Sequence, residues 1–295
     1  MRYDLCLPWY WEYDDAFADM VERACIEEGI SLWQIKPGNL LESITALYKG
    51  ITTFKTLLDR GQGEPTFEPI PRWAKEHCAW RINPAEVSVW SEDKTTMHLE
   101  FISAGLNTPH TIVLPSFLDQ PVIPPIDLTP LGQNFVIKPS NGGGGEGVII
   151  GAVSMDEILQ ARMEFPRQKY LIQSYITPQI IEETPAWFRV FYANGEAYPC
   201  WWTTDTHIYT VVTAEEEARY GLNRLRDITQ RIASICKLDW FSTEIALADD
   251  FIVVDYVNDE IDTRVQSQAM DGMPDEIMNS IARQLVYIAR DNLSR

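Results

Sequence analysis

The sequence predicts a small α/β domain at the N-terminus, followed by a larger α+β region built on β-hairpins. In residues 1–90, apolar runs of strand length alternate with amphipathic segments of helix length. That alternation is typical of a mostly parallel sheet covered by helices. After residue 134, apolar runs follow one another across short turns, which favours antiparallel pairing.

In the first part, strands are expected at 2–8, 31–35, 51–58 and 79–83, helices at 14–28 and 39–50, and a helical turn at 70–78. Asp14 and Asp15 suit the start of the first helix, and Gly29 suits its end. Asn39 is expected to cap the second helix, which stops at Gly50.

Next, a helix is expected at 91–105, capped by Ser91. A strand at 110–115 follows, then an extended connector at 115–130 that is rich in proline. Further strands are expected at 134–138, 148–153 and 170–176. A helix begins after Ser154, which forms a capping box with Glu157.

The last part is expected to contain a hairpin over 187–203, a helix at 214–236, strands at 240–248 and 251–257, and a helix from Pro274 to Arg290. Asn194-Gly195 favours the tight turn of the first hairpin, and Thr213 with Glu216 opens the long helix. Three units are therefore expected, at 1–90, 91–176 and 177–295.

Composition restricts the possible partners. Lys and Arg number 24 against 43 Asp and Glu, which gives a net charge of −19 and argues against nucleic acid and membrane as partners. No apolar stretch approaches the roughly 20 residues that span a bilayer. The N-terminus turns acidic and aromatic too early for a signal peptide, and the five cysteines are scattered without CxxC spacing. We therefore expect a cytoplasmic protein.

A glycine-rich loop stands out in FVIKPSNGGGGEGVII, residues 135–150. GxGxxG is present, but a strand follows instead of a helix, and no Gly-Lys-Ser/Thr occurs, so neither a dinucleotide fingerprint nor a P-loop fits. A hairpin tip remains, whose amides can wrap a polyphosphate above Lys138. The alternative is an ordinary mobile hairpin. The loop residues are Asn141, Gly142, Gly143, Gly144, Gly145, Glu146 and Gly147.

A pair of acidic strands forms a second candidate site. A hairpin turning near Asp249 and Asp250 would bring Glu244 opposite Asp255, with Asn258 just beyond. Facing carboxylates repel unless a cation lies between them, and magnesium prefers such oxygen ligands. The alternative is a solvated edge hairpin, although FIVVDYV is too apolar for one.

The order of these features resembles the ATP-grasp superfamily over essentially the whole chain. The resemblance implies an α/β N-terminal domain and an α+β ATP-grasp fold whose two modules clamp ATP. Lys94 and Lys138 resemble the two lysines of the family, and Asn141 to Gly147 its phosphate loop. The hinge strand that contacts adenine in the family is matched by Gln173, Ser174, Tyr175 and Ile176. Glu183 (rather than Glu182) resembles the acid that holds the ribose, and Arg189 the arginine at the reacting group. The magnesium ligands are matched by Glu244, Asp255 and Asn258.

Two departures from the family pattern concern the site. The usual acid-x-Asn signature is replaced by Asp255 and Asn258, three apart, so either the strand carries a bulge or Asp259 or Asp262 substitutes. Glu146 places a carboxylate inside the phosphate loop.

The resemblance implies an ATP- and Mg²⁺-dependent ligase that joins a small-molecule carboxylate to an amine through an acyl phosphate. Lys138, Arg189 and Arg264 are the catalytic candidates. Arg264 would grip a substrate carboxylate, or else form a salt bridge to nearby acids. A small-molecule kinase and a non-catalytic ATP-binding module are the alternatives. The sequence carries no signal for the oligomeric state.

Overall fold

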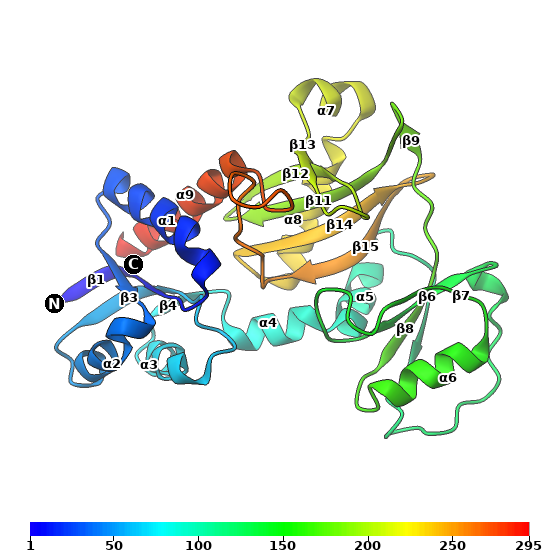
Figure 1. The fold of residues 1–295 in the computed structure, drawn as a ribbon, viewed down its shortest axis with the longest axis horizontal. Coiled ribbons are helices and arrows are strands. Elements are labelled where there is room, and N and C mark those ends of the chain that lie inside the picture. Colours follow the sequence, from blue (N-terminus) through cyan, green and yellow to red (C-terminus); the bar gives the residue numbers. More distant parts are fainter. Residues whose placement is uncertain (295) are drawn as a thin grey trace.

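The computed structural model describes residues 1–294. Its N-terminal part is a four-stranded, all-parallel sheet of order β2-β1-β3-β4, which confirms the predicted α/β character (Figure 1). Gly29 ends the first helix with a positive φ of 67°, as a left-handed cap requires. The elements are β1 Arg2–Pro8, α1 Asp15–Glu28, β2 Leu32–Ile35, α2 Leu40–Tyr48, β3 Thr53–Leu58, α3 Pro69–Glu76 and β4 Trp80–Ile82.

Asn39 has a different role from the predicted one. It closes a short 3-10 turn, Pro37–Asn39, and its Oδ1 accepts a hydrogen bond from the Lys36 N–H at 2.7 Å. Its side chain makes no capping hydrogen bond to α2.

The single helix predicted at 91–105 is wrong, because two helices occupy this region: α4 Ala85–Glu92 and α5 Lys94–Ser103. Asp93 between them is extended, and its carboxylate accepts from the Thr96 N–H at 2.8 Å. Asp93, and not Ser91, is therefore the cap, since Ser91 lies within α4. Lys94 consequently becomes the first residue of α5.

The middle part is an antiparallel sheet of order β5-β8-β6-β7, with α6 Met155–Glu164 packed on it (Figure 1). The strands are β5 Thr111–Leu114, β6 Phe135–Pro139, β7 Ile149–Ala152 and β8 Tyr170–Ser174. The predicted capping box of Ser154 and Glu157 is present. The proline-rich connector lies against α6, where the buried Arg162 donates to the carbonyls of Pro115, Ser116 and Gln120.

The C-terminal part is a five-stranded antiparallel sheet of order β13-β12-β11-β14-β15. Its strands are β11 Trp187–Ala193, β12 Glu196–Trp202, β13 Tyr209–Val211, β14 Trp240–Leu247 and β15 Phe251–Asn258. Asn194 and Gly195 both have positive φ, as the predicted hairpin turn requires. A two-stranded ribbon, β9 Ile180–Ile181 with β10 Thr184–Pro185, precedes this sheet.

The long helix predicted at 214–236 is also wrong. It is divided into α7 Ala214–Tyr220 and α8 Arg224–Cys236, because Gly221 adopts a φ of 68° and caps α7. The predicted capping box of Thr213 and Glu216 does open α7.

The last helix, α9 Asp275–Asp291, lies beside α1 and shares a hydrophobic core with it (Figure 1). The C-terminal chain thus returns to the N-terminal sheet. The unit boundaries after residues 90 and 176 stay predictions. In the part of the chain that the structure describes, no helix combines the length and apolar character needed to traverse a bilayer.

Candidate active site

The acidic strand pair has the predicted register. Glu244 on β14 lies opposite Asp255 on β15, and Ser242 lies opposite Asn258. Between these two pairs, β15 contains one residue more than β14, so β15 carries a bulge. Ser242 and Glu244 are two apart and point to one face of the sheet, so their partners Asn258 and Asp255 share that face. The bulge therefore accounts for the three-residue spacing of Asp255 and Asn258.

Arg189 extends this row of charges onto a third strand. It lies opposite Glu244 in the β11–β14 ladder, and its Nη1 forms an ion pair with Glu244 Oε1. Its Nε also donates to Ser242 Oγ at 3.1 Å. The two side chains of the ion pair are only 13% and 16% exposed, so little water screens their charges.

Burial raises the pKa of Glu244, and the nearby Asp255 raises it further. Arg189 and Lys138 act in the opposite direction, because each favours the ionised carboxylate. Two cations and a second carboxylate therefore surround Glu244 within one electrostatic cluster.

Lys138 reaches this cluster from the other sheet. It lies near the end of β6, and its Nζ donates at 3.1 Å to the carbonyl of Val254. Val254 lies between the paired residues Val253 and Asp255, at a second point where β15 has an extra residue. A bulged residue is left out of the strand ladder, so its carbonyl is available to Lys138.

The glycine loop begins three residues after Lys138, and residues 141–146 are exposed. Positive φ angles occur at Gly142, Gly144, Gly145 and Gly147, a backbone path that residues with a Cβ rarely follow. Two side-chain hydrogen bonds fix the base of the loop at its first residues. Lys94 Nζ donates to the Gly142 carbonyl at 2.8 Å, and Asn141 Nδ2 donates to Gln168 Oε1 at 3.1 Å.

Comparison with solved structures identifies the fold. D-alanine–D-alanine ligase from Bacillus anthracis in complex with ATP matches with a TM-score of 0.65 and 14% identity, covering 100% of this chain and 99% of that one. The ATP-grasp ligase PsnB in complex with a minimal precursor, Mg and ADP matches with a TM-score of 0.66 and 12% identity, covering 99% of both chains.

The chain has the ATP-grasp fold. The structure of D-cycloserine synthetase DcsG also matches, with a TM-score of 0.61 and 14% identity, covering 97% of this chain and 99% of that one. No family model matches the sequence, and no curated protein matches it. At these identities the likeness extends to the fold, and the residues of this chain must carry any functional conclusion.

The segment predicted to contact adenine, residues 173–176, covers the last two residues of β8 and the two residues after it. The strand ends at Ser174, two residues earlier than predicted. Gln173 is buried, and its Nε2 donates to the hydroxyls of Tyr256 and Thr111 at 2.7 and 3.1 Å, so its side chain ties the two sheets together. Tyr175 and Ile176 lie just beyond the end of the strand.

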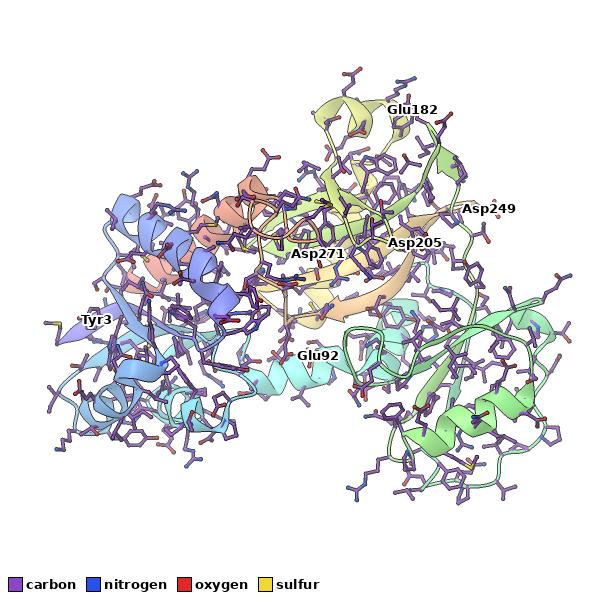
Figure 2. All side chains as sticks on the ribbon, in the orientation of Figure 1. Tyr3, Glu92, Glu182, Asp205, Asp249 and Asp271 are labelled. Atoms are coloured by element: carbon purple, nitrogen blue, oxygen red, sulfur yellow. The ribbon has the colours of Figure 1, made fainter. Side chains whose placement is uncertain are left out.

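The predicted ribose acid lies on a separate ribbon. Glu182 and Glu183 form the turn between β9 and β10, both with positive φ. Glu182 pairs with Arg219 at 2.9 Å and lies near α7, at the tip of the ribbon (Figure 2). Glu183 is exposed and forms no hydrogen bond or ion pair with any other predicted site residue that the structure describes.

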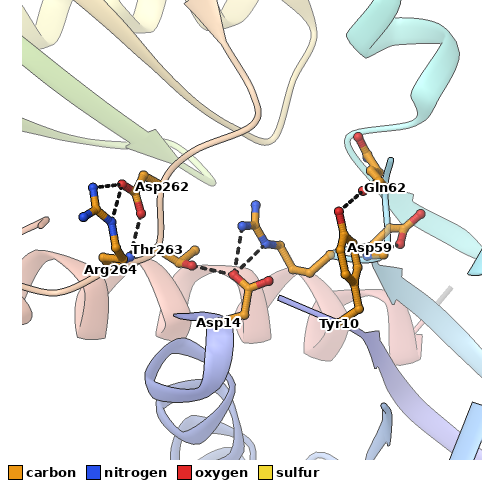
Figure 3. Close-up of polar contacts among 9 residues, drawn as sticks. Tyr10, Asp14, Asp59, Gln62, Asp262, Thr263 and Arg264 are labelled. Carbon is orange, nitrogen blue, oxygen red and sulfur yellow. Dashed lines mark hydrogen bonds and ion pairs between the residues drawn. The ribbon is translucent and has the colours of Figure 1, made fainter. Parts of the chain in front are cut away.

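Arg264 takes the second of its two predicted roles. Its guanidinium donates to Asp262 at 2.8 and 2.6 Å and to Asp271 at 3.2 and 3.0 Å. These carboxylates raise its pKa above the usual range. The guanidinium of Arg264 is occupied by protein carboxylates. Binding a substrate carboxylate would require Arg264 to break these hydrogen bonds. Asp262 is likewise engaged (Figure 3).

Asp259, the other alternative metal ligand, is buried beside Glu92. Burial and the neighbouring Asp259 raise the pKa of Glu92 to about 9. Among the residues that the structure describes, no three His, Cys, Asp or Glu side chains are arranged to hold a metal ion. Two facing carboxylates and the Asn258 amide fit a magnesium ion whose remaining ligands are phosphate oxygens and water.

A cavity of about 360 Å³ lies at the carboxyl ends of the parallel strands, and sequence reasoning missed it. Trp11 follows β1, Asp59 and Arg60 follow β3, and Asn83 follows β4. The chain after β15 closes the cavity with residues 259–262. Polar side chains just after predicted parallel strands were the available signal, because ligands gather at that edge of an α/β sheet.

Proposed function

We propose that the protein is an ATP- and magnesium-dependent ligase that joins a carboxylate to an amine and releases ADP and phosphate. One observation carries the proposal. Lys138, which leads into the glycine loop, meets the strand of Asp255 and contributes to the charge cluster of Glu244 and Arg189. A phosphate-wrapping loop, cations and paired carboxylates thus converge from two sheets. Ligase neighbours with the same fold support the reading.

In the proposed reaction, a carboxylate oxygen of the first substrate attacks the γ-phosphorus of ATP, and ADP leaves. The amine then attacks the resulting acyl phosphate and loses a proton, and phosphate leaves as the amide bond forms. Lys138 and the loop amides hold the phosphates, and Arg189 offsets the negative charge of the reacting groups. Magnesium held by Glu244, Asp255 and Asn258 supplies further positive charge to the phosphates.

The glycine loop has a separate task. Its exposed, glycine-rich tip can close over the nucleotide while its base stays fixed by Lys94 and Asn141. Closure would exclude water, which otherwise hydrolyses an acyl phosphate.

The nucleotide part of the proposal is tested by Lys138→Met. The variant removes the cation at the phosphates but keeps an unbranched apolar stem, so ATP affinity should fall by at least about 100-fold while the fold is retained. ATP affinity is measured by calorimetry and the fold by circular dichroism. Lys75→Met, at an exposed position of α3, is the matched control. Unchanged ATP affinity in Lys138→Met would refute the proposal.

The chemical part is tested by incubating the protein with ATP, magnesium and panels of small carboxylates and amines. A ligase releases phosphate and gives a product whose mass equals both substrates minus water. A product heavier by one phosphoryl group, without free phosphate, would identify a kinase instead.

A further inference from the structure

The cavity beside the N-terminal sheet has an unusual balance of charge. Among its lining residues are five acids and a single cation, Arg60. The acids are Asp14, Asp59, Asp259, Glu260 and Asp262. Arg60 is already engaged, since its Nε and Nη2 donate to Asp14 Oδ1 at 3.2 and 2.9 Å (Figure 3). Asp262 is paired with Arg264, so Asp59, Asp259 and Glu260 are the carboxylates that exceed the positive charge of the walls.

Two of these acids are buried with unused hydrogen-bonding capacity. Asp14 is 1% exposed and Asp259 is 7% exposed. Asp14 Oδ2 and Asp259 Oδ1 have no hydrogen-bond partner among residues 1–294. A buried carboxylate oxygen without a donor is costly, which favours a cavity whose occupant brings donors.

Asp59 is the acid nearest the sheet edge, directly after β3. Its Oδ1 accepts a hydrogen bond from the Gly61 N–H at 2.9 Å, and among the described residues it forms no ion pair. Burial raises its pKa to about 6, while Arg60 opposes the rise. Asp59 is thus ionised at neutral pH without a paired cation, an arrangement more common at ligand sites than in structural cores.

Aromatic side chains form another part of the wall. Tyr10 and Trp11 follow β1, and Trp240 lies at the start of β14. Arg60 already lies over the Trp240 ring, 5.7 Å from its centroid, so this wall accepts cations. Acids and ring faces together select a positively charged ligand with an apolar portion.

The cavity adjoins the charge cluster of the candidate active site. A smaller cavity of about 30 Å³ is lined by Arg189, and Ile261 and Asp262 line both cavities. Only the smaller cavity therefore separates a ligand in the larger cavity from Arg189, which pairs with Glu244.

We propose that this cavity binds the amine-bearing substrate as a cation, with its ammonium group against Asp59 and Glu260 and its apolar portion against Trp11. The identification of the ligand as the amine substrate rests on the proposed ligase function. The predicted ligand class is a primary amine with an aromatic or branched aliphatic portion.

The test uses three probes of similar size and different charge: 2-phenylethylammonium, 2-phenylethanol and 3-phenylpropionate. Affinities for the 295-residue protein are measured by calorimetry at pH 8, without nucleotide. The ammonium probe should bind at least about tenfold more tightly than either of the others, because a hydrogen bond between charged groups is stronger than one to a neutral group. Equal affinities for all three would overturn the proposal.

The double variant Asp59→Asn with Glu260→Gln should lower ammonium affinity by at least about tenfold and leave 2-phenylethanol affinity unchanged. Asp19→Asn on the exposed face of α1 is the matched control. Wild-type ammonium affinity in the double variant would contradict the assignment, as would displacement of the probe by magnesium chloride alone.

ATP affinity of the same double variant separates the two proposals. Lys138 lies outside the cavity walls, so ATP binding should persist in the double variant. If the wild-type protein binds ATP but shows no preference for the ammonium probe, the cavity assignment is rejected and the ligase proposal still stands. Ammonium selectivity without any ATP binding would reject the ligase, and with it the identification of the ligand as a ligase substrate.

Discussion

Single residues in this protein carry charge where burial disfavours it. Asp59 is ionised at neutral pH although burial raises its pKa to about 6. Burial and Asp255 raise the pKa of Glu244, while Arg189 and Lys138 oppose the rise. Each carboxylate lowers the free energy of unfolding unless a counter-charge offsets its desolvation. Carboxylates at such positions are more simply explained by ligand binding than by stability.

Asp59→Asn should therefore stabilise the protein in a defined pH range. The folded-state pKa of Asp59 is raised from 3.8 to about 6, so the folded state holds its proton more tightly than the unfolded state. The destabilisation it causes is absent below about pH 4 and complete above about pH 6. The asparagine Oδ1 can still accept from Gly61. At pH 7 the variant should gain on the order of 2 kcal/mol.

The measurement is urea unfolding of wild type and variant between pH 4 and pH 8. The two stabilities should converge toward pH 4 and diverge as the pH rises. A difference that stays constant across this range would show that Asp59 does not carry a raised pKa.

At the scale of elements, irregular backbone provides the functional groups. The bulges in β15 align Asp255 with Asn258 and leave the Val254 carbonyl to Lys138. In the glycine loop, Gly144 and Gly147 both have positive φ, but they differ in the atoms around them. A Cβ on Gly147 would lie 2.7 Å from the Phe165 ring, whereas a Cβ on Gly144 would meet nothing within 4 Å.

Gly147→Ala and Gly144→Ala should consequently differ in stability. Both place a Cβ on a left-handed residue, but only the first also forces the Phe165 ring to move. Gly147→Ala should lose roughly 2–3 kcal/mol and Gly144→Ala about 1 kcal/mol or less. Thermal melting of the two variants compares them directly. Equal melting temperatures would mean that Phe165 does not pack against the loop.

Sequence reasoning predicted most elements and failed where local signals compete. Ser91 and Asp93 are both good caps, and only the extended backbone of Asp93 decides which one begins α5. Gly221 was a visible stop signal within the helix predicted at 214–236. The pairing of Glu244 with Asp255 could be predicted because the register of a hairpin depends only on the position of its turn.

The partners of Arg264 and the acidic cavity were less accessible to the sequence. Asp271 reaches Arg264 within a loop that is closed by the bridge between Val265 and Met273. The cavity combines residues after β1, β3, β4 and β15, so it exists only once distant segments have assembled. Local patterns encode hairpins and caps, whereas contacts between residues far apart in the sequence depend on the packing of whole sheets.

In the whole molecule, the proposed nucleotide site is divided between two sheets. Lys138 and the glycine loop belong to the β5-β8-β6-β7 sheet, and Glu244 and Asp255 to the five-stranded sheet. Tyr256 holds the sheets together, because its hydroxyl bonds both Gln173 and His98, at 2.7 and 2.6 Å. Because the two halves of the site lie on different sheets, a substitution in one half should leave the ligand contacts of the other half intact.

Asp255→Asn tests this division. It removes one proposed metal ligand but leaves Lys138 and the Arg189–Glu244 ion pair in place. ATP affinity without magnesium should be unchanged, and the gain in affinity on adding magnesium should fall by at least about tenfold. Calorimetric ATP titrations with and without magnesium measure both values. A wild-type magnesium response would contradict the metal assignment.

The pairing of α9 with α1 has a consequence for biosynthesis. One hydrophobic core contains Phe17 and Val21 near the start of the chain and Leu285 and Ala289 near residue 291. During translation, α1 emerges from the ribosome long before its helical partner exists. Until α9 has been made, the face of α1 that packs against it stays uncovered on the nascent chain.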